Sequence, residues 1–412
     1  MKDRTGMATA TTRLPLLILI CGAAVLALNM GIRQTFGLFL EPVTLDLAMS
    51  RSNFALAIAV QNLLWGLLTP ACGMLADRYG TGRVLAAGGL LYALGNTVMA
   101  LGESAFAVHL GAGVMVGMAV GASGFPLVLA VVARSVPEER RSMALAIAAT
   151  GGSVGQFLLV PFSQVMIEGL GWPAALLILA ALAALIVPLA AALAGKPTMA
   201  AAGPASLGGA LSQARRHRGF LLLTAGFFVC GFHVSFIATH LPGYITSLNL
   251  DPLVGASALG LIGFFNILGG LAAGVLGSRF RLKYVLSMIY LARAVAIGLF
   301  LFGPKTEWAV FAFSAVIGLL WLSTVPLTSS LVGQIFGSRF MATLFGIVML
   351  GHQLGAFFGA WLGGLSYDLT GSYDGVWILS ILLGLLAVAL HWPIADRPLA
   401  AQPAAAETNG VA

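Results

Sequence analysis

The chain has 412 residues, of which 59% are hydrophobic and only 8% are charged, about a third of the charged fraction that is typical of soluble domains. Its net charge of +7 would suit a nucleic-acid-binding protein if the chain were soluble, but its basic residues lie between long apolar runs, so a membrane explains them better. Cys21, Cys72 and Cys230 all fall inside apolar runs, without the spacing of a disulfide framework or a metal cluster. We expect no metal, no cofactor and no nucleic-acid partner.

Twelve apolar segments that are long enough to cross a bilayer follow one another along the chain. Residues 1–13 are polar, and the run 14–40 is too long for the core of a signal peptide and leads into further apolar runs, so we expect an uncleaved first span. The other spans are expected at 52–75, 84–101, 105–133, 142–167, 172–193, 220–245, 253–276, 284–302, 308–335, 341–365 and 376–391. The sequence therefore predicts an all-α integral membrane protein with twelve transmembrane helices.

Lysine and arginine divide unequally between the two sets of connecting segments. With the N-terminus inside, the inner segments hold seventeen of them, whereas the outer loops hold only Arg51 and Lys305. This bias predicts a multi-pass protein of the plasma (cell inner) membrane with both termini in the cytoplasm.

The widest interruption of the apolar pattern, 195–218, is rich in Ala, Gly, Ser and Pro and ends in a basic cluster. We expect a cytoplasmic linker there, because it separates two sets of six spans. The predicted organisation is a cytoplasmic N-terminal segment (1–13), an N-terminal six-helix bundle (14–194), the linker (195–218), a C-terminal six-helix bundle (219–392) and a cytoplasmic tail (393–412). Residues 397–412 are expected to be disordered.

A short polar motif separates the second and third spans. It runs Gly-Met-Leu-Ala-Asp-Arg-Tyr-Gly-Thr-Gly-Arg, and its candidate gating residues are Gly73, Asp77, Arg78, Gly80 and Arg83. We expect Gly73 to let two helices approach closely, and Gly80 to allow a tight reversal together with the glycine two residues later. Asp77 can sit near a helix terminus or pair with an arginine. The motif resembles the signature between helices 2 and 3 of the major facilitator superfamily; a chance match is the alternative.

The motif returns in the second half of the chain, which argues against chance. Gly274, Leu276 and Arg279 match Gly73, Leu75 and Arg78 at an offset of 201, although Ser278 replaces the aspartate. Pro126 with Pro326, and the Gly151/Gly155 pair with Gly351/Gly355, repeat at an offset of 200. A constant offset indicates two similar halves. The resemblance implies two six-helix bundles that rock around a central cavity, in a protein that we expect to be a monomer.

Arg33 is the most informative residue of the spans. Among the basic residues only Arg33 and Arg293 fall within expected spans, and no acid lies deep in one; Glu41 and Asp46 are placed just past the outer end of the first. Because an unpaired cation inside a membrane protein is costly, it usually faces a cavity and meets an anion. We expect the substrate to supply that anion. The alternative is that Arg33 snorkels to the outer surface or pairs with Glu41.

Asn29, Arg33 and Phe36 share one face of the first helix at helical spacing. The surrounding stretch, Arg-Gln-Thr-Phe-Gly-Leu-Phe, resembles the first helix of the monocarboxylate porter family, in which Pro-Lys-Ser-Phe-Gly-Val-Phe supplies a lysine that contacts the carboxylate. Arg33 falls on that lysine, and a guanidinium can bind a carboxylate through two hydrogen bonds. The resemblance then departs in helix 8, because Asn266 and Gly270 stand where the porters carry an aspartate and an arginine. A proton-linked ion pair is therefore not expected there.

Histidines are the remaining candidates for a coupling proton. His233 and His240 are seven residues apart, hence on one face of the seventh span, and His352 lies in the eleventh beside Gln353. Because the resemblance implies that helices 1 and 7 face each other, we expect the first two to border the central cavity. The alternative for each is a neutral histidine hydrogen-bonded between helices. Arg293 is expected to be peripheral and structural.

These observations predict a transporter rather than an enzyme, since the sequence has no phosphate loop, metal spacing or nucleophile elbow. We expect a secondary active transporter that moves a small organic anion, such as a monocarboxylate, by alternating access, with a coupled proton. The substrate-binding candidates are Arg33, Asn29, Phe36, His233, His240, Asn266, His352 and Gln353. The alternative is a proton-driven exporter of drugs or metabolites, although the fifth span lacks the Gly-Pro antiporter signature and buried carboxylates are absent. A non-transporting membrane sensor is a third class. Apart from the substrate and the proton, the expected partners are membrane lipids.

Overall fold

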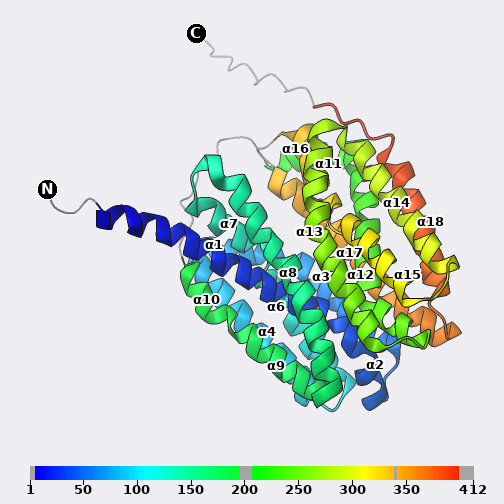
Figure 1. The fold of residues 1–412 in the computed structure, drawn as a ribbon. Helices are drawn as coiled ribbons and strands as arrows, with labels where there is room; N and C mark the ends of the chain where they lie inside the picture. The colour runs from blue at the N-terminus through cyan, green and yellow to red at the C-terminus, as the bar shows by residue number, and fades with distance from the viewer. Residues whose placement is uncertain (1–4, 195–206, 338–340, 399–412) are drawn as a thin grey trace, which may run out of the picture.

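The computed structural model describes residues 5–194, 207–337 and 341–398, and within these ranges the regular structure is helical (Figure 1). The helices are α1 (Thr5–Gln34), α2 (Phe36–Asp46), α3 (Arg51–Tyr79), α4 (Thr81–Leu101), α5 (Ala105–Val108), η1 (His109–Met115), α6 (Val116–Ser123), α7 (Phe125–Ser135), α8 (Glu138–Leu170), α9 (Trp172–Ala184), α10 (Ile186–Ala192), α11 (Leu207–Arg216), α12 (Arg218–Ser247), α13 (Pro252–Arg279), α14 (Leu282–Phe302), α15 (Glu307–Leu320), α16 (Thr324–Phe336), α17 (Met341–Thr370) and α18 (Asp374–His391).

Among the described residues, twelve single or joined helices are long and apolar enough to cross a membrane, which confirms the predicted twelve spans. Four spans are interrupted helices: α1–α2, α5–η1–α6–α7, α9–α10 and α15–α16. The first span extends to Asp46, six residues beyond its expected end at 40, so Glu41 and Asp46 belong to the helix rather than to a loop. Polar residues at a helix end can lie at the headgroup level, where an apolar run no longer marks the boundary. The expected linker contains a helix, α11, that the sequence did not suggest; 1–4, 195–206 and 399–412 lie outside the described residues.

The two halves repeat one packing arrangement. Gly151 and Gly155 bring α8 against α1, since a Cβ at either position would overlap the carbonyl oxygen of Ala23 or Ala27. At an offset of 200, Gly355 brings α17 against α12 in the same way, at the carbonyl oxygen of Phe228. Close backbone approach through small residues is the usual packing of membrane helices. The repeat of glycines along the sequence therefore reflects equivalent helix–helix contacts in the two halves.

Arg293 supports the interruption of the tenth span, where α15 ends at Leu320. Its guanidinium donates hydrogen bonds to the carbonyl oxygens of Leu320 and Trp321 and to the Sγ of Cys230, at 3.3 Å for the last. The N–H of Leu322 donates to Oδ1 of Asn266 at 3.0 Å. An irregular backbone inside a membrane protein needs such partners, because no water is present to satisfy it. Arg293 is thus occupied by backbone carbonyls within the second half.

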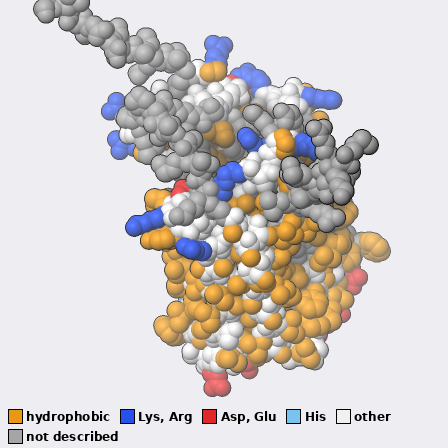
Figure 2. All heavy atoms as spheres, turned by 90° about the vertical axis from the view of Figure 1, so that its left-hand side faces the viewer, with side chains coloured by type: hydrophobic (Ala, Val, Ile, Leu, Met, Phe, Trp, Pro, Cys, Tyr) orange, Lys and Arg blue, Asp and Glu red, His pale blue; other side chains and the backbone are white. Residues whose placement is uncertain are grey.

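Charge separates the two ends of the bundle. The end that carries the helix ends Tyr79, Ser135, Arg216 and Arg279, called the basic end below, displays Lys and Arg side chains above a broad hydrophobic belt (Figure 2). Asp46, Arg51, Ser247 and Thr370 lie at the opposite end, called the closed end for the contacts described next. An apolar belt between two polar ends is the surface that a bilayer requires.

Candidate functional site

The closed end is held together by Arg51 and Asp368, which come from different halves. The carboxylate of Asp368 on α17 accepts hydrogen bonds from the backbone N–H groups of Arg51 and Ser52, at 3.1 and 2.8 Å, at the N-terminus of α3. The Arg51 guanidinium donates to the Tyr373 hydroxyl at 2.7 Å and stacks on the ring of Tyr367. A carboxylate at a helix N-terminus is favoured by the helix dipole and the free N–H groups.

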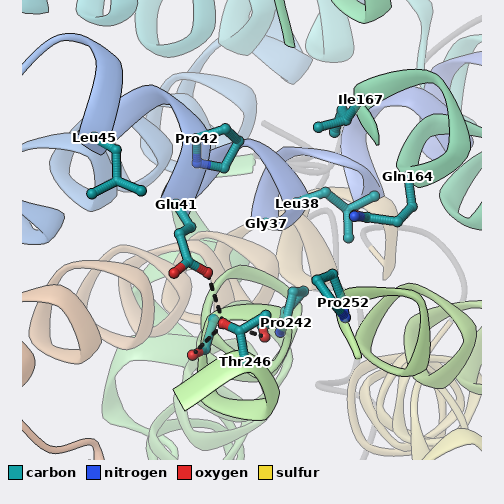
Figure 3. Close-up of a pocket in the computed structure, with 11 residues that line it drawn as sticks. Gly37, Leu38, Glu41, Pro42, Leu45, Gln164, Ile167, Pro242, Thr246 and Pro252 are labelled. Atoms are coloured by element: carbon teal, nitrogen blue, oxygen red, sulfur yellow. Dashed lines mark hydrogen bonds between the residues drawn. The ribbon is translucent and has the colours of Figure 1, made fainter. Parts of the chain in front are cut away.

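Glu41 adds a second contact between the halves at this end. Its Oε2 accepts a hydrogen bond from the Thr246 hydroxyl of α12 at 2.7 Å (Figure 3). Its Oε1 lies 3.9 Å from the Arg51 guanidinium. Glu41 is therefore engaged with Arg51 and Thr246. The alternative in which it pairs with Arg33 is not the arrangement that the structure has.

Arg33 lies deeper, at the interface between α1 and α3. Its guanidinium donates hydrogen bonds to Oδ1 of Asn62 and, at 3.1 Å, to Oε1 of Gln34, and it stacks over the ring of Trp65 at 4.7 Å. Its Nε has no hydrogen-bond partner in the described part of the chain, and no carboxylate there lies within ion-pair distance of it. A charged group that meets only neutral amide oxygens and a ring retains capacity for an anion.

Two hydrogen-bonded connections run from this cluster into the second half. Nδ2 of Asn62 donates to the Ser235 hydroxyl of α12 at 3.1 Å. On the other side, Nε2 of Gln34 donates to Oε1 of Gln156 at 3.1 Å, and Nε2 of Gln156 donates to the carbonyl oxygen of Leu259 on α13 at 2.8 Å. A chain of amides therefore links α12, α3, α1, α8 and α13 through the Arg33 cluster.

Within the described residues, the hydrogen bonds between the halves extend from the closed end to the middle of the spans. Besides those above, Nδ2 of Asn266 donates to the Ser153 hydroxyl at 2.9 Å, near the midpoints of α13 and α8. None of them reaches the basic end. The structure is therefore a conformation in which the halves are joined at one end.

Two cavities follow the same interface, on either side of Gly37. The larger cavity, of about 240 Å³, lies between α2, α8, α12 and α13 and reaches the surface at the closed end. Glu41, Gln164 and Thr246 are among its mainly apolar lining residues (Figure 3). The smaller, about 10 Å³, adjoins Arg33, Gln34 and Phe36. Gly37 lines both, and a Cβ on it would overlap the Ala238 carbonyl oxygen of α12. The contact at Gly37 therefore separates the outer cavity from Arg33. We place the candidate site at Arg33 rather than in the larger cavity, because Arg33 carries the uncompensated charge.

The first span is interrupted beside this cluster. Between α1 and α2, Thr35 makes a 3₁₀-type turn: its N–H and its hydroxyl both approach the Ile32 carbonyl oxygen, at 3.1 and 2.7 Å. A hydroxyl that returns to its own helix backbone commonly bends the helix. Interrupted helices are a recurrent feature of transporter binding sites, and here the interruption directly follows Arg33 and Gln34.

The histidines lie away from Arg33. Nε2 of His233 hydrogen-bonds to the Ser380 carbonyl oxygen of α18 at 2.8 Å, and Nε2 of His240 to the Ala360 carbonyl oxygen of α17 at 2.6 Å. Both rings are buried. The expectation that they border the central cavity is corrected: the face that they share packs inside the second half. Seven-residue spacing fixes a common face of a helix but not its direction.

Gln353 reaches the interface between the halves, and His352 lies beside it with its ring packed on Phe227 of α12. Nδ1 of His352 is 3.0 Å from Oε1 of Gln353, and the Gln353 side chain packs on Gly66 of α3, in the other half. Asn29 instead points into the first half, donating to the Ser123 hydroxyl at 2.6 Å. The Asn266 side chain donates a hydrogen bond to Ser153 and accepts one from the backbone N–H of Leu322, between α15 and α16. Of the eight candidates, the structure brings Arg33 and Phe36 together at one small cavity and leaves the others outside it.

The motif between the second and third spans, residues 73–83, makes no contact between the halves among the described residues. Gly80, at φ +97°, makes the reversal between α3 and α4 as expected. Asp77 is exposed at the last turn of α3, without an ion-pair or hydrogen-bond partner among the described residues; Arg83 is exposed too, and Arg78 stacks only on its neighbour Tyr79. A Cβ on Gly73 would meet open space. The expected close approach at Gly73 is therefore absent among the described residues in this conformation.

The residues that sequence reasoning missed are amides. Gln34, Asn62 and Gln156 lie in expected spans, and each is buried, so they are polar groups in apolar runs that need partners. Their positions within apolar runs are visible in the sequence, but their partners are not. Asp368 was missed for a different reason: its role depends on the distant helix N-terminus at Arg51, which no local pattern reveals.

Comparison with known proteins gives a consistent family. The sequence profile described as Major Facilitator Superfamily matches residues 19–343. Relatives include an uncharacterized MFS-type transporter, YcxA, of Bacillus subtilis, 24% identical with 89% of this chain and 91% of the relative covered, and monocarboxylate transporter 11 of Mus musculus, 28% identical with 86% and 82% covered. Among solved structures, the nucleoside transporter NupG superposes with a TM-score of 0.78 at 16% identity, covering 92% of this chain and 98% of that one. That likeness concerns the fold alone.

Proposed function

Because this chain belongs to the Major Facilitator Superfamily, we propose that it is a secondary transporter of a small organic anion, a monocarboxylate, which works by alternating access. The observation that carries the proposal is the state of Arg33, a central cation with amide and aromatic neighbours and no carboxylate in ion-pair reach among the described residues. An incoming carboxylate would supply the missing charge. Relatives named monocarboxylate transporters, at 24–28% identity, support the same substrate class.

The orientation is part of the proposal. Lys and Arg gather at the basic end (Figure 2), which we place in the cytoplasm on the positive-inside rule. The closed end is then extracellular or periplasmic, and the conformation described above is inward-facing. Rocking of the halves would break the contacts of Asp368, Glu41 and Gly37 and connect the outer cavity to Arg33.

We assign the coupling proton to His352. His233 and His240 are fixed to carbonyl oxygens inside the second half. His352 lies beside Gln353, which contacts α3 across the interface, so its protonation state bears on how the halves meet.

The test of the function is transport itself. Purified protein in liposomes should take up radiolabelled acetate, lactate or benzoate, and a pH gradient should accelerate uptake. Empty liposomes and protein with Arg33→Gln are the controls. Uptake of an amphiphilic cation such as ethidium, with none of the acids, would replace the anion porter by the drug exporter.

A further inference from the structure

Asn62 connects the anion site to the opposite half. It is completely buried on α3, and one amide group makes three hydrogen bonds. Its Oδ1 accepts from the Arg33 guanidinium, while its Nδ2 donates to the Ile58 carbonyl oxygen at 2.9 Å and to the Ser235 hydroxyl of α12 at 3.1 Å. Moving this side chain therefore affects Arg33 and the contact between the halves together.

The position of the Asn62 oxygen is the one that an anion needs. It accepts from a terminal nitrogen of Arg33, as one carboxylate oxygen does in a two-pronged pair. The adjoining cavity of about 10 Å³ is about the size that holds one water. A carboxylate cannot reach that nitrogen while Asn62 remains in place.

The chemistry favours exchange of the amide for an anion. A hydrogen bond to an ionised acceptor is roughly twice as strong as one to a neutral acceptor, so a carboxylate outcompetes the amide once it can enter. An aspartate here would instead form a permanent ion pair and exclude the substrate. Asparagine satisfies the buried guanidinium without neutralising it.

We propose that the substrate carboxylate displaces the Asn62 side chain from Arg33, and that this displacement releases Ser235 and loosens the interface between the halves. Asn62 is then the residue that couples occupancy of the site to opening of the closed end. The inference rests on the proposed function and adds to it a coupling residue and a step. The connection through Gln34 and Gln156 does not pass through Asn62, so it stays intact.

The experiment measures affinity and opening separately. Binding of acetate, lactate and benzoate is determined in purified wild-type protein and in Asn62→Asp, Asn62→Ala and Ser235→Ala, each checked for folding by its melting temperature. Opening is followed by the distance between spin labels at Leu45 and Leu253, which are exposed at the closed end on α2 and α13.

We expect Asn62→Asp to weaken binding at least tenfold, since its carboxylate occupies Arg33, while the protein stays folded. Asn62→Ala, which removes the competing amide, should bind the acid at least as tightly as wild type, and Ser235→Ala should keep affinity within about threefold. Both variants should lose most of the widening that the acid causes. Wild-type affinity in Asn62→Asp, or undiminished widening in both other variants, overturns the coupling role. If wild-type protein binds none of the three acids, the proposed function fails as well, so the two failures are distinct.

Discussion

Gly37 on α2 lies against the carbonyl oxygen of Ala238 on α12 so closely that even a methyl group has no room between them. This contact separates the outer cavity from the space beside Arg33. In the proposed cycle it must open for substrate to pass, and it closes only because position 37 has no side chain.

Gly37→Ala is accordingly expected to favour the conformation in which the two halves separate at the closed end. Labelling of Ile58→Cys, at the small cavity, by an impermeant thiol reagent should be at least several-fold faster with Gly37→Ala than without it. Gly270→Ala, where a Cβ meets nothing within 4 Å, is the matched control and should not change the rate. Equal labelling in the two alanine variants would show that Gly37 does not limit closure.

Asp368 is expected to stabilise the same closed end through charge. Asp368→Asn keeps the size of the side chain but removes the charge that the two N–H groups of α3 meet. Because Asp368 is exposed, we expect a loss of about 0.3–1 kcal/mol. The spin-label distance between Leu45 and Leu253 should shift toward longer values in the variant. Asp374→Asn, an exposed acid at the same end, serves as the control; an unchanged distance distribution in Asp368→Asn contradicts the assignment.

The segment after α18 gives a prediction about pH and stability. Hydrogen bonds from Arg281, at 2.5 and 3.0 Å, lower the pKa of Asp396 below its usual value. A carboxyl whose pKa is lower in the folded state stabilises the fold above its unfolded pKa of about 3.9, and the contribution is lost as the pH falls through the folded value. Asp396→Asn should therefore lower the melting temperature at pH 7, and the difference from wild type should shrink below about pH 4. A difference that persists at low pH would mean that the pair is not its cause.

Proton coupling is expected to depend on His352. If its ring carries the proton, His352→Gln should flatten the pH dependence of lactate uptake, because glutamine keeps a hydrogen-bonding amide but cannot take up a proton. His233→Gln is the comparison: it should lower the melting temperature, since a buried hydrogen bond is disturbed, but leave the shape of the pH profile unchanged. The opposite pattern, with His233 controlling the profile, would move the proton into the second half.

The fold could be predicted from the sequence because the length and composition of each span are local features of the chain. Each span is a predominantly apolar run of sufficient length, and the repeat of Gly151/Gly155 at Gly351/Gly355 reports the same helix contact twice. The interruption at Thr35 and helix α11 were not predicted, since a single hydroxyl contact and a short amphipathic segment leave hydropathy almost unchanged.

The site was only partly accessible. Arg33 could be singled out because a buried charge is rare, and the anion that it meets stays a prediction. The partners of Arg33 could not be derived, because Asn62 and Gln34 are ordinary polar residues whose meaning depends on how α1, α3 and α8 rotate against one another. The rotation of α12 against α17 and α18 likewise decides that His233 and His240 point away from the interface.

The most direct test of the account is the affinity of purified, folded protein with Arg33→Gln for the acid that wild-type protein transports. We expect a loss of about 1.5–3 kcal/mol, which is about ten- to more than a hundredfold in affinity. Arg33→Lys should lose less, because it keeps the charge but not the planar donor pair, and Arg134→Gln at the basic end should bind normally. If Arg33→Gln binds the acid as tightly as wild type does, Arg33 is not the anion site.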